Sequence, residues 1–219
     1  MQRSKTIPLL TAAVATGMLA VAGGALAKND ADRGGGERYR AALSAVPHDP
    51  AADGGSNASG RAKLTLRGSS LDVMLKGRGL SPNLPHAAHI HGKDHPEIAT
   101  CPGPDRRAGG VSDSLIETVD GLADYGPILV SFTTSGGTTP ADGLALDRMP
   151  VAKDNGKVIY RRTIDVPTEV ADHLDEKHIV IHGHDIDGDG GYDPGPITAL
   201  GAPLEAELPV ACGEIRPQR

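Results

Sequence analysis

Apolar and polar residues alternate through two neighbouring segments of the chain. Residues 62–67 (Ala-Lys-Leu-Thr-Leu-Arg) and 71–76 (Leu-Asp-Val-Met-Leu-Lys) each place every second side chain on one apolar face, and residues 68–70 (Gly-Ser-Ser) separate them. Because successive side chains of a strand point to opposite faces, a period of two is typical of half-buried strands. The two segments with their short polar connection therefore predict a β-hairpin.

Short apolar runs between glycine- or proline-bearing loops predict five further strands, at residues 87–91, 128–133, 158–164, 178–182 and 204–210. Only residues 168–174, which open with Thr168 and Glu169, have the start signal of a short helical turn. About seven short strands without intervening helices predict an all-β fold, either a β-sandwich or a barrel, with long loops. The chain has one phenylalanine, four tyrosines and no tryptophan, so its core must be aliphatic.

The first 27 residues have the pattern of a secretory signal peptide. Arg3 and Lys5 precede an apolar run over residues 7–22, and residues 25–27 (Ala-Leu-Ala) form the small-x-small pattern that signal peptidases recognise. The run is short and broken by glycine, and no later segment approaches the roughly 18 to 20 apolar residues of a spanning helix. We therefore expect a protein without a membrane span that is secreted or held in the cell envelope.

Two parts are expected after this leader. Residues 28–60 are rich in Asp, Gly, Ala, Ser and Asn and have little to bury, so they predict a flexible, low-complexity tether. Residues 61–219 then form one β domain of ordinary size.

Charge and cysteine content narrow the function classes. The formal net charge of −6 becomes −8 without the leader, because residues 1–27 contain two basic and no acidic residues. An acidic protein of this kind is unsuited to binding nucleic acid or an anionic membrane. In an oxidising compartment Cys101 and Cys212 predict one structural disulfide. Closing a loop of roughly 110 residues contributes about 4 to 5 kcal/mol in the chain-entropy model.

Two His-x-His pairs are the strongest chemical signal. Residues 85–92 (Pro-His-Ala-Ala-His-Ile-His-Gly) contain His89 and His91, and a later strand ends with His182 followed by His184. In a strand both members of such a pair share a face, so each pair can offer two imidazoles to one point. If the two strands lie close together, three or four nitrogens converge, which suits copper, zinc or nickel better than calcium or magnesium.

Four short motifs, in this order, resemble the copper/zinc superoxide dismutase family. They are His-Ile-His at residues 89–91, Ala-Thr-Cys at 99–101, Ile-Val-Ile-His-Gly-His-Asp at 179–185 and Val-Ala-Cys-Gly-Glu-Ile at 210–215. The resemblance covers most of residues 62–215 and implies a Greek-key β-barrel. It also implies that His89, His91 and His182 bind copper, that Cys101 and Cys212 are bonded, and that superoxide dismutation is the activity to test.

The chain departs from the family pattern in three ways. The family's fourth copper histidine also bridges to zinc, yet no histidine occurs between His95 and His173, so we expect no zinc site of the family type. Pro209 stands where the family has an arginine that attracts the superoxide anion. A long segment over residues 105–149, whose role the sequence leaves open, replaces the loop that precedes the zinc ligands. Whether the site is catalytic therefore stays open.

The fourth copper ligand has two candidates. His184 shares a face with His182, whereas His86 has the opposite parity from His89 and His91. We therefore expect His184, rather than His86, to complete the site.

An acidic loop follows the second histidine pair. Asp185, Asp187, Asp189 and Asp193 occupy positions 1, 3, 5 and 9 of an EF-hand-like calcium loop, with glycine at position 6. Position 12 is Pro196 instead of glutamate, so the pattern is incomplete. A calcium site, a solvated acidic turn and a role for Asp185 or Asp187 in orienting a ligand imidazole remain as alternatives.

A non-enzymatic function is the competing interpretation. The His-Ile-His-Gly segment and Gly-Glu-Ile-Arg at residues 213–216 also resemble the domain repeated in chordin-type extracellular proteins. This implies an extracellular binding or envelope module with structural histidines. Converging nitrogens of His89, His91 and His182 would favour the metal site, whereas nitrogens bound to backbone groups would favour the module. The chain has no Gly-x-Ser-x-Gly motif and no glycine-rich phosphate loop after a strand, so hydrolase and nucleotide-dependent functions are not indicated.

Overall fold

A computed structural model describes residues 35–53, 55–107 and 114–219 of the chain. The predicted signal peptide and the first part of the predicted tether lie outside these residues. Eight strands are present: β1 (Glu37–Ala45), β2 (Ser59–Arg67), β3 (Ser70–Arg78), β4 (Ala88–His91), β5 (Ile128–Ser131), β6 (Val158–Asp165), β7 (His178–His182) and β8 (Pro209–Pro217). The helices α1 (Thr118–Tyr125), α2 (Thr168–Asp172) and α3 (Leu204–Glu207) are short. Four 3-10 turns complete the set: η1 (Pro104–Arg107), η2 (Pro140–Asp142), η3 (Leu146–Arg148) and η4 (Leu174–Glu176).

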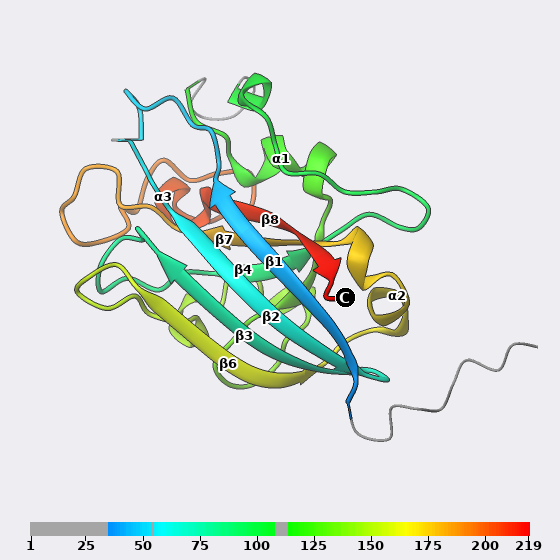
Figure 1. Ribbon diagram of the computed structural model, residues 1–219. Helices are drawn as coiled ribbons and strands as arrows, with labels where there is room; N and C mark the ends of the chain where they lie inside the picture. The colour runs from blue at the N-terminus through cyan, green and yellow to red at the C-terminus, as the bar shows by residue number, and fades with distance from the viewer. Residues whose placement is uncertain (1–34, 54, 108–113) are drawn as a thin grey trace, which may run out of the picture. The chain divides into compact units, whose positions relative to one another are not determined.

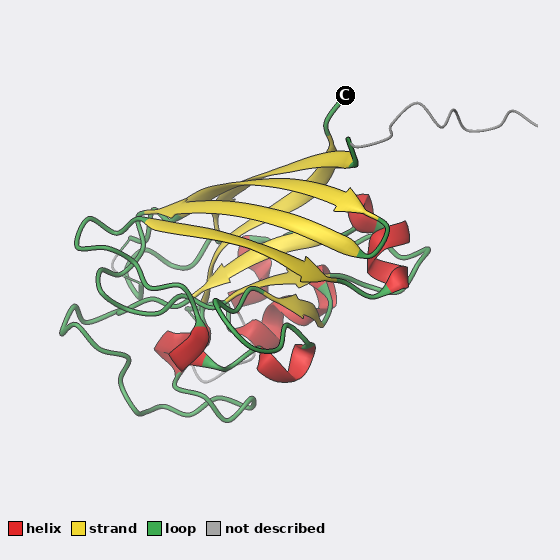
Figure 2. Cartoon of the chain, turned by 90° about the horizontal axis from the view of Figure 1, so that it is seen from below, coloured by secondary structure: helices red, strands yellow, loops and turns green. Residues whose placement is uncertain are grey.

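The strands form one antiparallel sheet in the order β5-β4-β7-β8-β1-β2-β3-β6. The sheet curls, so that the half containing β1, β2, β3 and β6 crosses the half containing β4 and β7 (Figure 1). Strand β8 pairs with β7 through its first part and with β1 over most of its length, and so joins the two halves. Figure 2 shows the helices and most long loops gathered on one side of the strands. The predicted all-β class is therefore confirmed.

The core lies between the inner faces of the two halves. Leu64 and Leu75 from β2 and β3 belong to the same buried cluster as Ile90 and Ile179 from β4 and β7. Each aliphatic side chain of this size contributes about 1.5 to 3 kcal/mol when fully buried. Phe132 and Tyr160, stacked with ring centroids 5.3 Å apart, are the only aromatic ring pair in this cluster among the described residues. The core is aliphatic, as the composition predicts.

Two predicted segments have a different structure from the one expected. The predicted tether over residues 28–60 contains β1, in which Tyr39, Ala41 and Leu43 are buried and the intervening side chains are exposed. The polar and glycine-rich flanks of this short alternating run concealed it. The predicted strand over residues 204–210 instead begins with α3, and β8 follows from Pro209.

The predicted disulfide is confirmed, because Cys101 and Cys212 are bonded. It ties the segment before η1 to β8, across 111 residues of sequence. In the described part of the chain, no helix has the length and apolar character needed to cross a membrane.

Strands β4 and β7 are buried on both faces. One face carries Ile90, Ile179 and Ile181 into the core. The other face carries the histidines, and the loops and helices of residues 115–149 and 183–208 cover it. The described part of the long segment over residues 105–149, namely residues 114–149, therefore forms part of the cover over this face.

Candidate metal centre

Three histidines converge on the covered face of β4 and β7. His89 pairs with Val180 and His91 with His178 in the antiparallel register, so His89, His91 and His182 lie on the same face of adjacent strands. Their ring centroids are 5.0 to 5.6 Å apart. One ring nitrogen of each lies within 4.8 Å of those of the other two, close enough for all three to bind one ion. This buried triad could hold a metal ion.

Each ring of the triad is held by a backbone carbonyl. His89 Nε2 donates to the carbonyl of Gly143 at 3.0 Å, and His91 Nδ1 donates to that of Gly126 at 2.9 Å. His182 Nδ1 donates to the carbonyl of Glu207 at 2.7 Å. A carbonyl only accepts, so these nitrogens carry the hydrogen and the tautomer of each neutral ring is fixed.

The second nitrogen of each ring has no hydrogen-bond partner. These atoms are His89 Nδ1, His91 Nε2 and His182 Nε2, and all three are buried. In the neutral rings they carry lone pairs, since the hydrogen sits on the other nitrogen. Leaving three buried acceptors unpaired is costly, and a cation placed between them would satisfy all three at once.

Electrostatics keeps the triad neutral. Burial and the neighbouring histidines lower the pKa of His91 to about 3 and hold the pKa of His89 well below its usual value. Burial lowers the pKa of His182 to about 4, although the Glu207 carbonyl opposes the shift. Neutral imidazole is the form that binds metals. Histidine ligands typically donate their other N–H to a carbonyl or carboxylate, which is the arrangement found at all three rings.

The segment over residues 105–149 supplies two of the three carbonyls. Gly126 follows α1 with φ 76°, and a Cβ there would lie 2.2 Å from the carbonyl oxygen of Gly92. Glycine is therefore required for the chain to turn beneath His91. Tyr125 packs against the His91 ring with centroids 4.6 Å apart and donates its hydroxyl to the carbonyl of Thr118.

A pocket of about 240 Å³ adjoins the triad. His89, His182 and Glu207 line it, together with Thr118 and mainly apolar residues: Ala87, Ile128, Pro140, Ala141, Gly143, Leu144, Leu200 and Ala206. The Leu144 and Leu200 side chains are about two-fifths exposed, which marks the open side of the pocket.

Glu207 is a buried acid in this pocket. Its side chain is 2% exposed, and neither carboxylate oxygen makes a hydrogen bond of normal geometry. Burial raises the pKa of Glu207 to about 7, although the side chain of Thr198 lowers this pKa to a smaller extent. The carboxylate is not among the atoms that lie within 4.8 Å of one another around the triad. Glu207 is therefore a neighbour of the centre rather than part of the ligand set.

The two other candidate ligands lie elsewhere. Strand β7 ends at His182, and Gly183, with φ 100°, turns the chain, so the alternation that would bring His184 to the triad stops there. His184 Nε2 instead contacts the carbonyl of Asp53 at 2.6 Å. Both nitrogens of His86 contact backbone carbonyls, those of Ser81 and His182. The expectation that His184 completes the site is not supported by this geometry.

The acidic loop folds into two carboxylate groups. Asp187 lies with Asp189 and Asp193 in one group and with Asp185 and Glu205 in the other. Glu205 is buried and accepts N–H bonds from Ile186 and Asp193. The sequence pattern missed Glu205 because it lies beyond the end of the loop. Calcium binding by Asp185, Asp187, Asp189 and Asp193 stays a prediction.

Neither Asp185 nor Asp187 orients a triad imidazole. Backbone carbonyls already occupy the non-ligand nitrogen of His89, His91 and His182. Asp185 instead accepts N–H bonds from Gly188 and Gly190 within its own loop.

Comparison with known proteins adds no family assignment. The chain matches no protein-family model, and no curated protein is significantly similar to it. The sequence motifs and the geometry of the histidines therefore carry the functional conclusion.

Proposed function

We propose that this protein is an exported copper-binding protein, related to the copper/zinc superoxide dismutases, with its metal at His89, His91 and His182. The observation that carries the proposal is the convergence of three buried imidazoles, each with one nitrogen fixed by a carbonyl and the other without a partner. This combination is what a preformed nitrogen site requires.

The chemistry of the donors favours copper. Three imidazoles form the group, without a carboxylate or a thiolate, and both cysteines are in the disulfide. Nitrogen ligands of this type bind Cu²⁺ most tightly among the divalent first-row metals. Bound copper would supply one-electron redox chemistry. Three protein ligands would leave a coordination position for an incoming molecule, and the adjoining pocket offers a route to it.

The order of the strands supports the proposed relationship. Strands β3 and β6 are neighbours, as are β4 and β7, although neither pair is consecutive in sequence. Long connections of this kind between adjacent antiparallel strands are a feature of Greek-key folds.

Superoxide dismutation is the activity that follows from the sequence motifs. Apart from the triad, the pocket is lined mainly by apolar residues, with Thr118 and the acidic Glu207, and no arginine or lysine is among its lining residues. An anion would therefore reach the metal without attraction from a fixed positive charge at this entrance. We expect any dismutation to be slower than in an enzyme with a guiding guanidinium.

The binding-module alternative explains only half of the geometry. The carbonyl bonds of the three rings would suit purely structural histidines. A structural role gives no reason for three converging rings each to leave one buried nitrogen without a partner. The metal site accounts for both sets of nitrogens.

Copper binding can be tested by titrating the disulfide-intact, chelator-treated protein with Cu²⁺, using calorimetry and electron paramagnetic resonance. We expect one tight site with nitrogen hyperfine structure, and at least a tenfold loss of affinity in His89→Ala and His182→Ala. His86→Ala and His184→Ala are matched controls, since both remove histidines outside the triad, and each should retain the tight site. Circular dichroism and urea unfolding verify that each variant is folded.

Wild-type affinity in both His89→Ala and His182→Ala would overturn the proposal. The activity has a separate measurement, the decay of superoxide in the presence of the copper-loaded protein. A decay rate equal to that of the metal-free protein would reject dismutation while leaving copper binding intact.

A further inference from the structure

The outer face of one half of the sheet is strongly basic, although the chain as a whole has a formal net charge of −6. Along β1 the buried side chains point into the core, so Arg38 and Arg40 point outward, and the same alternation holds for the neighbouring strands. The outward cations are Arg38, Arg40, Arg61, Lys63, Arg67, Lys76, Arg78, Arg161 and Arg216. The outward acids on these strands are Asp72, Asp165 and Glu214.

The strand register places several of these cations directly opposite one another. Arg40 pairs with Arg216 on β8 and with Lys63 on β2, which gives a row of three cations across adjacent strands. In a neighbouring row Arg61 lies opposite Lys76. Adjacent strands are about 4.8 Å apart, and like charges directly opposite each other destabilise a sheet. The folded protein thus carries a repulsion that apolar or neutral residues would avoid.

The nearby acids do not neutralise this face. Asp72 is bonded to Arg67 and Thr163 at the far end of the hairpin, and Glu214 is bonded to Arg216. Among the residues that the structure describes, Arg40, Arg61, Lys63 and Lys76 form no ion pair or side-chain hydrogen bond. Their donors are free for an external partner.

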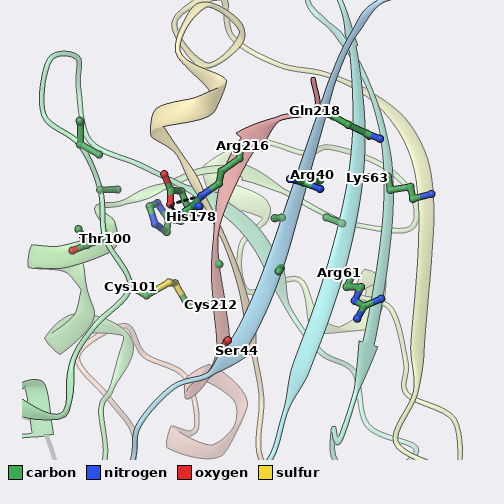
Figure 3. A pocket seen from close by; sticks show the side chains of 17 residues that line it. Arg40, Ser44, Arg61, Lys63, Thr100, Cys101, His178, Cys212, Arg216 and Gln218 are labelled. Carbon is green, nitrogen blue, oxygen red and sulfur yellow. Dashed lines mark hydrogen bonds and ion pairs between the residues drawn. A yellow bond between two sulfur atoms is a disulfide. The ribbon is translucent and has the colours of Figure 1, made fainter.

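The same face is hollowed into an open cleft of about 980 Å³ (Figure 3). Arg40, Arg61 and Lys63 line it together with the Arg216–Glu214 ion pair, and the segment carrying Thr100 and the disulfide forms its opposite side. His178 also lines the cleft, is 4% exposed and has an unpartnered Nδ1. The cleft therefore combines free surface cations with a buried polar atom that lacks a partner.

We propose that this basic face binds an extended polymer whose anionic groups are sulfates or phosphates. Charge complementarity selects the partner, because the attraction it supplies offsets the repulsion between the opposed cations. The row of Arg216, Arg40 and Lys63 continues through the uncharged Met74 on β3 to Arg161 on β6. Its outermost cations are therefore four interstrand spacings, or about 19 Å, apart, which exceeds the reach of one small anion. The basic strands carry no outward aromatic side chain on which nucleobases could stack, so a polymer without bases fits better than single-stranded nucleic acid. This binding does not depend on the proposed copper centre.

The test uses fluorescence anisotropy with labelled heparin and labelled long-chain polyphosphate as the two probes. Both the chelator-treated and the copper-loaded protein should bind, and affinity should fall as NaCl is raised, as expected when cations displace condensed counterions. The double variant Arg40→Gln/Lys63→Gln should bind at least tenfold more weakly. The control Lys93→Gln/Lys153→Gln makes the same charge change at loop positions outside the basic strands and the cleft and should lose less than threefold.

Urea unfolding is a second measurement, which excludes misfolding as the cause of weaker binding. Because Arg40 and Lys63 repel each other, Arg40→Gln/Lys63→Gln should unfold at the same or a higher urea concentration than the wild type. Equal losses of affinity in the two double variants would show attraction by net charge alone and overturn the proposal. Absence of binding to both probes at 50 mM NaCl, or tighter binding to duplex DNA or to phosphatidylglycerol vesicles, would also overturn it. None of these outcomes depends on whether the histidine variants lose copper binding. Failure of the copper proposal can therefore be distinguished from failure of this one.

Discussion

Replacing Glu207 by glutamine should stabilise the metal-free protein, and increasingly so as the pH rises. Burial raises the pKa of this carboxyl from 4.5 to about 7, so the folded protein holds the proton more tightly than the unfolded chain. The resulting stabilisation is fully present below pH 4.5 and is lost as the pH rises through about 7. Glutamine has nearly the same shape and never ionises, so the variant lacks this loss.

The expected size follows from the shift of the pKa. Each unit corresponds to about 1.4 kcal/mol, so the shift from 4.5 to about 7 sets an upper limit of about 3.5 kcal/mol for Glu207 well above pH 7. Water entering the pocket past Leu144 and Leu200 screens part of this penalty, so we expect about 2 kcal/mol.

The assay is urea unfolding of wild type and Glu207→Gln at pH 5, 6, 7 and 8 in the presence of a chelator. The free energy of unfolding of the variant minus that of the wild type should rise by about 2 kcal/mol between pH 5 and 8. The three histidines titrate in both proteins, and so does every other ionisable group, so their contributions cancel in this difference. A difference that stays constant within about 0.5 kcal/mol would refute the raised pKa of the buried Glu207 carboxyl.

Two further predictions concern the disulfide and the turn at Gly126. Cys101→Ser/Cys212→Ser should lower the free energy of unfolding, measured in urea, by about 4 to 5 kcal/mol, because the disulfide spans 111 residues. A loss below about 1 kcal/mol would contradict the explanation by chain entropy. Gly126→Ala should cost more than about 2 kcal/mol, since its Cβ would lie 2.2 Å from the Gly92 carbonyl oxygen. It should also weaken copper binding, because the resulting shift moves the Gly126 carbonyl that accepts from His91. Gly55→Ala, with φ 80° and open space around it, is the matched control for backbone strain alone, and an equal loss in both glycine variants would exclude the steric explanation.

The sequence predicted much of the sheet because most strands bury one face or lie between clear turn signals. Strand β7 begins and ends at the predicted residues, and β2 and β3 extend slightly beyond their predicted ranges. Strand β1 was missed since its inward residues include alanine and its surroundings are rich in glycine and aspartate. Helix α1 was also missed, because its apolar stripe is short and contains Gly121.

Only the part of the candidate site that follows from the alternation of side chains along a strand could be predicted from the sequence. The period of two placed His89 and His91 together, and the second strand added His182. The same rule failed for His184, because Gly183 adopts a conformation that ends the alternation. The groups that fix the rings are backbone carbonyls of Gly126, Gly143 and Glu207, and residue type does not reveal a carbonyl's direction. The buried state of Glu207 likewise depends on the fold.

The pairing of β1 with β8 has a consequence for how the chain folds. These are the first and last strands of the described domain, yet they lie side by side in the middle of the sheet. Contacts between such distant segments slow folding, because much of the chain must be ordered before they form. A nascent chain that still lacks β8 has open edges at both β1 and β7. That intermediate would be the species most in need of a chaperone and most prone to aggregate.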